Sequence, residues 1–211
     1  FQGVSAHAGG SPHLGVNAMY AANTALTAIN ALRETFKDDD HIRVHPIITA
    51  CGEAVNAIPD RGCMESYVRG SKMDALVSAN KKVNRALAAS AAAIGAKVRI
   101  EDFLGYHTIW YDRTMMDVMK TAMEQVLDQV SFEPDTVNGG CSDVGDLSAV
   151  MPVLHPYIGG ASGKLHGSDM FITDPDLACV DSAKVQMVFL RLMLENDAAK
   201  AKEAVAAKKN G

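Results

Sequence analysis

The sequence predicts an α+β protein whose first half is a ferredoxin-like domain, an antiparallel sheet with two helices on one face. Over residues 1–104 the apolar periodicity changes in the order strand, helix, strand, strand, helix, strand, which is typical of that fold. Beyond residue 111 helical spacing dominates. With 211 residues, 48% of them hydrophobic, the chain can hold two small cores. We therefore expect two parts, residues 1–111 and 112–211.

The elements of the first part follow from local patterns. A helix over 17–32 carries an apolar stripe at spacings of three and four, and strands over 42–51 and 57–69 alternate in polarity. A second helix is expected from a Ser71 cap to Ile94, before Gly95. The outer strands are expected at 97–104 and before His7. Because the sequence opens at Phe1, the first strand is expected to lack its beginning.

The second part is predicted to be mainly helical. Helices are expected over 113–130, capped by Asp112, over 144–151 and over 177–194, which the alanine- and lysine-rich residues 198–211 extend or leave frayed. One strand is expected over 153–158, with His155 in its core. A lone strand makes a poor sheet, so this part is expected to need strands from elsewhere.

Charge and cysteine usage exclude several functional classes. A formal net charge of −5 without a basic cluster argues against nucleic acid as the main partner. No apolar run reaches the roughly 18 residues of a membrane helix, and no secretory signal is visible. Four scattered cysteines without a C-x-x-C pair favour reduced thiols and a cytoplasmic protein.

Residues 140–166 combine glycines, aspartates and two histidines in one short stretch. Glycine lets backbone approach a ligand closely, and histidine beside aspartate suits metal binding or acid–base chemistry. A glycine-rich connection between core elements explains the same composition. Asp143 and Asp146, three apart at a helix start, are expected to cap that helix.

Seven motifs carry a resemblance to a known family. They are FQGVSAHA (1–8), RVHPII (43–48), VNAIPD (55–60), YVRG (67–70), GCSDVGD (140–146), LHPY (154–157) and LH (165–166). In this order they resemble family twenty of the metallopeptidases, the aminoacylase and carboxypeptidase G type of co-catalytic metallohydrolases. The later motifs are similar to its amidohydrolase branch, near aminobenzoyl-glutamate hydrolase and the β-alanyl-lysine type dipeptidases.

The resemblance implies a ferredoxin-like lid followed by the C-terminal part of an α/β metallohydrolase catalytic domain. In that family two divalent ions, zinc or manganese, hold a water that attacks an amide carbonyl. By position, the resemblance implies one metal ligand, one catalytic histidine that reaches the scissile carbonyl oxygen, often across a dimer, and four substrate-binding positions. These are, in turn, His166, His7, and the set Asn56, Arg69, Gly159 and Gly160.

The chemistry of these residue types suits the implied roles. A neutral imidazole binds zinc or manganese, a second imidazole stabilises an oxyanion, and arginine grips a carboxylate through two hydrogen bonds. Structural interpretations stand beside them. His7 hydrogen-bonds its own loop, Asn56 shapes a hairpin turn, Arg69 is a solvated charge, or His166 is an ordinary surface histidine.

The departures from the family limit what this chain can do alone. No H-x-D motif and no Glu-Glu pair occurs in the sequence, although the family's metal ligands and catalytic acid lie in such motifs. One ligand, His166, cannot hold a catalytic metal. We therefore expect the fragment to bind no metal stably and to be inactive by itself.

Two functional hypotheses follow. In the first, the chain is part of a metal-dependent amidohydrolase that cleaves an N-acyl amino acid, aminobenzoyl-glutamate or a dipeptide, and it forms a homodimer through the lid. In the second, it is a non-catalytic dimerisation or ligand-binding module that uses the edge strand and helices of the lid. A stand-alone regulatory domain would leave residues 140–166 unexplained.

Overall fold

The computed structural model describes residues 1–134 and 140–210, which form two compact units. Unit 1 comprises residues 1–105, and unit 2 comprises the described residues from 106 onward. The expected sequence of an α+β part and a more helical part is present. The functional division between residues 111 and 112 stays a prediction.

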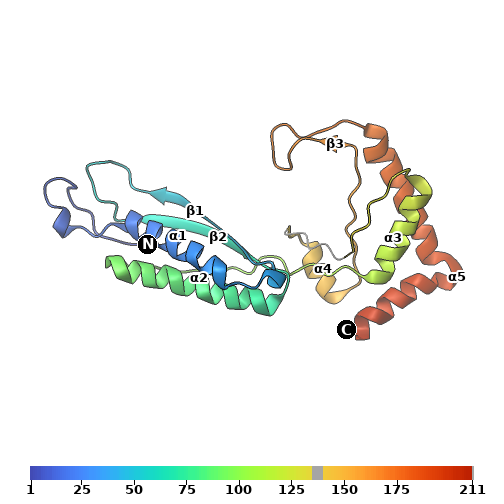
Figure 1. The fold of residues 1–211 in the computed structure, drawn as a ribbon, viewed down its shortest axis with the longest axis horizontal. Helices are drawn as coiled ribbons and strands as arrows, with labels where there is room; N and C mark the ends of the chain where they lie inside the picture. The colour runs from blue at the N-terminus through green and yellow to red at the C-terminus, as the bar shows by residue number, and fades with distance from the viewer. Residues whose placement is uncertain (135–139, 211) are drawn as a thin grey trace. The chain divides into compact units, whose positions relative to one another are not determined.

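Unit 1 is built on an antiparallel hairpin covered by two helices. Strand β1 (Arg43–Cys51) pairs with β2 (Gly62–Arg69), and α1 (Ala18–Leu32) and α2 (Met73–Ile94) lie side by side along it (Figure 1). Short 3₁₀ turns occupy Pro12–Leu14, Arg33–Thr35 and Asp38–Asp40. The predicted helices and hairpin are therefore confirmed.

The two outer strands of the predicted sheet are reduced to single bridges. Gln2 bridges Arg61, just before β2, on one side and Lys97 on the other, both antiparallel. This is the neighbour relationship that a ferredoxin-like sheet requires. The expected strand over 97–104 is nevertheless wrong beyond Lys97, because residues 98–104 find no ladder partner among the described residues.

The core of unit 1 lies between the hairpin and the helices. Its buried cluster consists of Ile29, Ile42, Val44, Ala79 and Val83. Along α1, four alanines at helical spacing are fully buried, which lets neighbouring backbone approach closely. Asn17 caps α1 because its Oδ1 accepts hydrogen bonds from the backbone N–H groups of Met19 and Tyr20.

The cap predicted for α2 is wrong. The residue at the N-cap position is Lys72, whose side chain makes no capping hydrogen bond. Ser71 instead donates its hydroxyl to the carbonyl oxygen of Asp39 at 3.3 Å.

Unit 2 is a set of helices with one very short hairpin. Its elements are α3 (Arg113–Val126), α4 (Val144–Val150), β3 (Ala161–Ser162), β4 (Phe171–Ile172), a π-helical turn (Asp176–Asp181) and α5 (Ser182–Asn210) (Figure 1). Helices α3 and α5 pack through a buried cluster of Met119, Ala122 and Val185. Asp112 caps α3, as predicted, by accepting from the backbone N–H of Met115 at 2.8 Å.

The strand expected over 153–158 does not form. Its backbone is irregular, and His155 is exposed and stacks on Tyr157 with ring centroids 5.5 Å apart. A strand is stable only when its N–H and C=O groups pair with a neighbour, and the described part of unit 2 supplies none. The burial predicted for His155 is therefore wrong.

Helix α5 is broken near its middle. Asn196, Asp197 and Ala198 have φ of 55°, 60° and 57°, a left-handed conformation that costs non-glycine residues free energy. The reversed last segment packs Ala204 against Val118 and Met193. Residues 198–210 are thus helical, but they do not continue the direction of the preceding helix.

The Ile29→Ala substitution should lower the free energy of unfolding of unit 1 by about 3 kcal/mol, because Ile29 is 1% exposed and its loss leaves a cavity. The control Leu14→Ala, at a side chain that is 65% exposed, should change it by less than about 0.5 kcal/mol. Urea unfolding followed by circular dichroism measures both. Equal effects would contradict the core described above.

Candidate functional site

His7 lies in a turn that fixes which ring nitrogen carries the proton. Its Nδ1 accepts hydrogen bonds from the backbone N–H groups of Gly9 at 3.1 Å and Gly10 at 2.8 Å. A ring nitrogen that accepts is unprotonated, so the proton of the neutral ring sits on Nε2. The exposed ring of His7 therefore offers an Nε2–H donor.

Asn56 lies next to His7, in the connection between β1 and β2. His7 forms an antiparallel bridge with Ala57, and the backbone N–H of Ala8 donates to the carbonyl oxygen of Asn56 at 2.9 Å. The fold thus brings together two of the residues that the motifs indicated. The backbone of Asn56 shapes this junction, and its side chain is exposed.

Arg69 lies at the other end of the hairpin. It is the last residue of β2 and pairs in register with Arg43. Its guanidinium carbon lies 4.9 Å from the centroid of the Tyr67 ring, and its Nε is buried without a hydrogen-bond partner among the described residues. At about 3.3 Å per residue, strand β2 separates Arg69 from the Asn56 connection by about 20 Å. The structure does not bring Arg69 to His7 within one copy of unit 1.

In unit 2, His166 and the two glycines share one small hairpin. His166 lies between β3 and β4, with φ of 65° and an exposed ring. The N–H of Gly167 donates to the carbonyl oxygen of Lys164 at 2.7 Å and closes the turn around it. The carbonyl oxygen of Gly160 accepts from the N–H groups of Thr173 at 2.9 Å and Asp174 at 3.1 Å.

Gly160 has a structural reason to be glycine. Its φ is +95°, and a Cβ there would lie 2.6 Å from the carbonyl oxygen of Asp174 and 2.8 Å from the backbone nitrogen of Ala178. At Gly159 a Cβ would meet only the flexible side chain of Leu177, at 3.2 Å. The role of either glycine in substrate binding stays a prediction.

The metal pair implied by the resemblance does not fit the residues of this chain that the structure describes. Among them, no group of three or more histidine, cysteine, aspartate or glutamate side chains is close enough together to hold a metal ion. His166 would supply a single imidazole, and a catalytic site needs three or more protein ligands. The ligand role of His166 stays a prediction.

Two polar contacts near α4 were not predicted. Asp146, expected to be a cap, instead accepts from the backbone N–H of His107 at 2.8 Å, and Asp143 makes no side-chain cap. The buried hydroxyl of Ser148 accepts from the N–H of Trp110 at 3.1 Å and donates to the carbonyl oxygen of Gly145 at 2.7 Å. These contacts attach α4 to residues 107–110, a long-range pairing that no local pattern reveals.

Tyr111, next along the chain, carries the shifted titration of this region. Burial raises the pKa of its phenol, and the neighbouring Tyr157 adds to the rise. The backbone N–H of Asp112 donates to the carbonyl oxygen of Val153 at 3.0 Å. Segment 153–158 is therefore attached to the start of α3 although it is not a strand.

The Gly160→Ala substitution should destabilise unit 2 by about 2–4 kcal/mol, because both its φ and its close backbone neighbours oppose a Cβ. Gly159→Ala is the matched control and should cost less than about 1 kcal/mol. Urea unfolding of both variants makes the comparison. A neutral Gly160→Ala would show that the backbone does not approach as closely as described.

Comparison with known proteins adds evidence to these geometries. Residues 1–95 match the family model described as the peptidase dimerisation domain. The chain is 32% identical over 160 residues to a Xaa-Arg dipeptidase of Mus musculus, covering 74% of this chain and 37% of that protein. It is 26% identical over 143 residues to a p-aminobenzoyl-glutamate hydrolase homolog of Haemophilus influenzae, covering 68% and 31%.

A solved structure shows the same fold. The crystal structure of the aminopeptidase PepT from Bacillus cereus superposes with a TM-score of 0.65 at 19% identity, over 89% of this chain and 48% of that one. The chain thus spans less than half the length of each of these proteins. Together the matches confirm the resemblance that the motifs carry: the chain belongs to family twenty of the metallopeptidases.

Proposed function

We propose that this chain supplies the lid and one wall of the active site of an amide hydrolase. The substrate class is an N-acyl amino acid, an aminobenzoyl-glutamate or a dipeptide, and the enzyme works in the cytoplasm, where its four free cysteines stay reduced. The observation that carries the proposal is the held tautomer of His7. The dimerisation-domain match over residues 1–95 supports the assignment of the lid.

His7 serves as the donor to the scissile carbonyl. The two N–H groups that occupy its Nδ1 keep the proton on Nε2, so the ring is ready to donate without rotating or changing tautomer. As the carbonyl carbon becomes tetrahedral, negative charge develops on the oxygen, and a fixed donor stabilises that charge more than it stabilises the ground state. Asn56, which lies beside it, contacts the same part of the substrate.

Arg69 binds the carboxylate of the substrate. Its guanidinium lies over the Tyr67 ring, which orients the planar fork, and its Nε lacks a hydrogen-bond partner among the described residues. A carboxylate that accepts from Nε and one Nη would satisfy that buried donor through two parallel hydrogen bonds. The proposal thus assigns a ligand to an atom that otherwise bears a desolvation cost.

Two copies of the lid are needed to complete one site. The length of β2 places His7 and Arg69 about 20 Å apart, farther than a small amide substrate extends. We therefore propose a homodimer in which one protomer contributes His7 and Asn56 to a site where the other contributes Arg69. Strand β1 pairs with β2 on one side only, and its exposed Ile47 marks an edge at which a second copy can pair.

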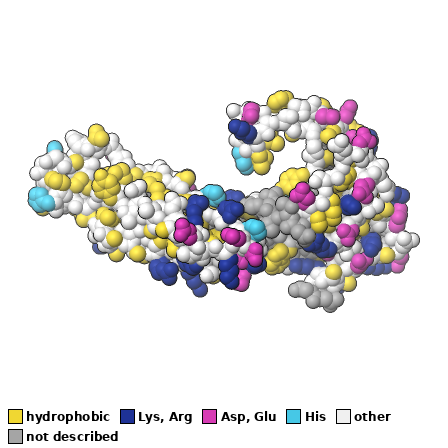
Figure 2. Space-filling view, viewed as in Figure 1, with side chains coloured by type: hydrophobic (Ala, Val, Ile, Leu, Met, Phe, Trp, Pro, Cys, Tyr) yellow, Lys and Arg dark blue, Asp and Glu magenta, His cyan; other side chains and the backbone are white. Residues whose placement is uncertain are grey.

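Unit 2 supports the wall assignment through its surface. On α5, Met187, Leu190 and Leu194 recur at helical spacing and are 72%, 57% and 63% exposed, on the side opposite the residues packed against α3. Hydrophobic side chains lie on the visible surface of unit 2 in Figure 2. An apolar stripe of this kind is stable when further polypeptide covers it, so we propose that unit 2 packs against the rest of the catalytic domain.

The metal chemistry of the family is left outside this mechanism. The zinc or manganese pair would need ligands that the described residues do not supply, so no step proposed here passes through a metal. The alternative function is a dimerisation or ligand-binding module without catalysis. The exposed edge of β1 favours that alternative equally, and activity decides between the two.

The amide hydrolase proposal predicts no turnover by the 211-residue chain with zinc or manganese on a dipeptide or benzoyl-glutamate substrate. It also predicts an H-x-D and a Glu-Glu motif in frame in the DNA upstream of the Phe1 codon. In the longer product, His7→Ala should lower kcat about 100-fold with little change in KM, because an oxyanion donor acts in the transition state.

His13→Ala, on an exposed histidine of the neighbouring 3₁₀ turn, is the matched control and should leave kcat unchanged. Equal losses in the two variants would remove His7 from the site. An upstream frame without those motifs would favour the binding-module alternative.

The dimer proposal predicts that Ile47→Lys, on the open edge strand, converts the dimer to a monomer, because a charge on an edge strand opposes strand pairing. Val77→Lys, on the exposed side of α2, is the control and should leave the dimer intact. Sedimentation velocity at micromolar protein reports both states. A dimer that survives Ile47→Lys would place the interface elsewhere.

A further inference from the structure

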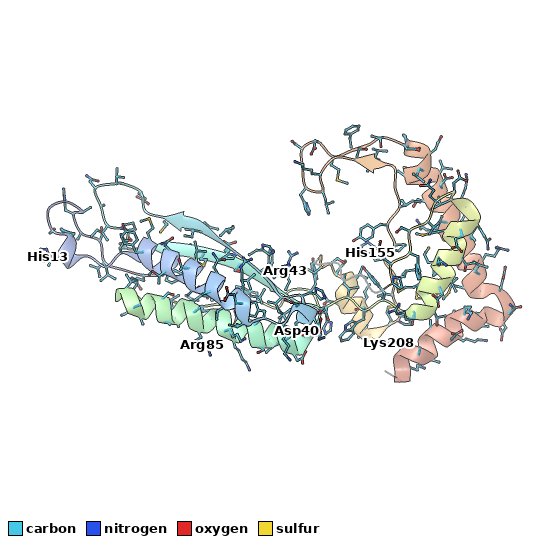
Figure 3. All side chains as sticks on the ribbon, viewed as in Figure 1. His13, Asp40, Arg43, Arg85, His155 and Lys208 are labelled. Atoms are coloured by element: carbon cyan, nitrogen blue, oxygen red, sulfur yellow. The ribbon has the colours of Figure 1, made fainter. Side chains whose placement is uncertain are left out.

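The outer edge of β1 carries a pocket that the proposed function does not use. It has a volume of about 410 Å³, and its basic lining consists of Arg33, Lys37, His41 and Arg43. Figure 2 shows Lys and Arg side chains gathered at this end of unit 1, and Figure 3 labels Arg43 there, near Asp40. A basic pocket is unexpected in a chain of net charge −5.

Two arginines are held side by side at this edge. An Nη of Arg33 donates to the carbonyl oxygen of Val44, and an Nη of Arg43 donates to that of Ile42, both at 3.1 Å. Carbonyls two residues apart on one strand edge are separated by about 7 Å. Each guanidinium thus uses one donor on the backbone and is held close to the other, with donors remaining for a ligand.

Carboxylates do not neutralise these cations. No ion pair within 4 Å joins Arg33, Lys37 or Arg43 to a carboxylate of the described residues. Asp38 is the one acidic residue in the lining. Neighbouring like charges repel, so the arrangement is stabilised when an anion lies between them.

We propose that this pocket binds the phosphate group of a small molecule that also has an apolar part. A phosphate presents three strong acceptor oxygens, enough for both guanidiniums and the Lys37 ammonium at once, whereas a carboxylate presents two. The side chains of Phe36 and Ile42, which also line the pocket, supply an apolar wall. The inference stands independently of the proposed function, because neither His7 nor Arg69 takes part.

The test is calorimetric titration of the 211-residue protein with inorganic phosphate, phenyl phosphate and acetate at low ionic strength. We expect saturable 1:1 binding of both phosphates, about fivefold tighter for phenyl phosphate because of the apolar wall, and at least about tenfold weaker binding of acetate. Equal affinity of the two phosphates would overturn the apolar part of the assignment, and point to free phosphate. Acetate that binds as tightly as phosphate would overturn the phosphate assignment itself.

Variants connect that binding to the pocket. Arg33→Gln and Arg43→Gln should each weaken phosphate binding about tenfold, and Arg43→Lys should fall between Arg43→Gln and the unaltered protein, because it keeps the charge but loses the planar fork. Arg85→Gln, the same change on the exposed side of α2 away from the pocket, is the matched control (Figure 3). Thermal melting verifies that each variant folds. Unchanged affinity in the Arg33→Gln/Arg43→Gln double variant, or no saturation below about 50 mM phosphate, would overturn the proposal.

Discussion

The pairing of β1 with β2 is the constraint on which the rest of unit 1 depends. It is the one extended ladder among the described residues, and Ile42, Val44, Met64 and Val68 from this hairpin pack against α1 and α2. Because the hairpin is rigid and eight or nine residues long, whatever lies at its two ends is held at a fixed separation. The hairpin therefore sets the geometry of both groups of candidate residues.

That separation turns a sequence of motifs into a statement about assembly. His7 and Asn56 meet at the connecting end because His7 bridges Ala57, while Arg69 remains at the open end beside Arg43. A flexible lid could bring such residues together by bending, but a paired hairpin with a packed face resists bending. Two lids are the simpler way to place an oxyanion donor and a carboxylate ligand on one small substrate.

Local patterns predicted the helices well and the strands poorly, for one physical reason. The bounds of α1 and the cap of α3 follow from apolar spacing and from Asn17 and Asp112, which act within one turn of the chain. Residues 97–104 and 153–158 alternate or are apolar in the same way as β1, yet a strand also needs a partner that lies far away in sequence. The link between Asp146 and His107 was missed for the same reason, since it joins residues 39 apart.

Gly160 shows how structure divides a role that sequence leaves whole. The resemblance makes it substrate-facing backbone, and a glycine there is consistent with a close ligand. Yet its φ of +95° and the 2.6 Å approach of the Asp174 carbonyl already require glycine without any ligand. Its own carbonyl oxygen accepts from both Thr173 and Asp174, so a contact between Gly160 and a substrate falls to its N–H group. An N–H donor suits a carbonyl or carboxylate oxygen of the substrate, which is compatible with His7 and Arg69 binding the other oxygens of the same molecule.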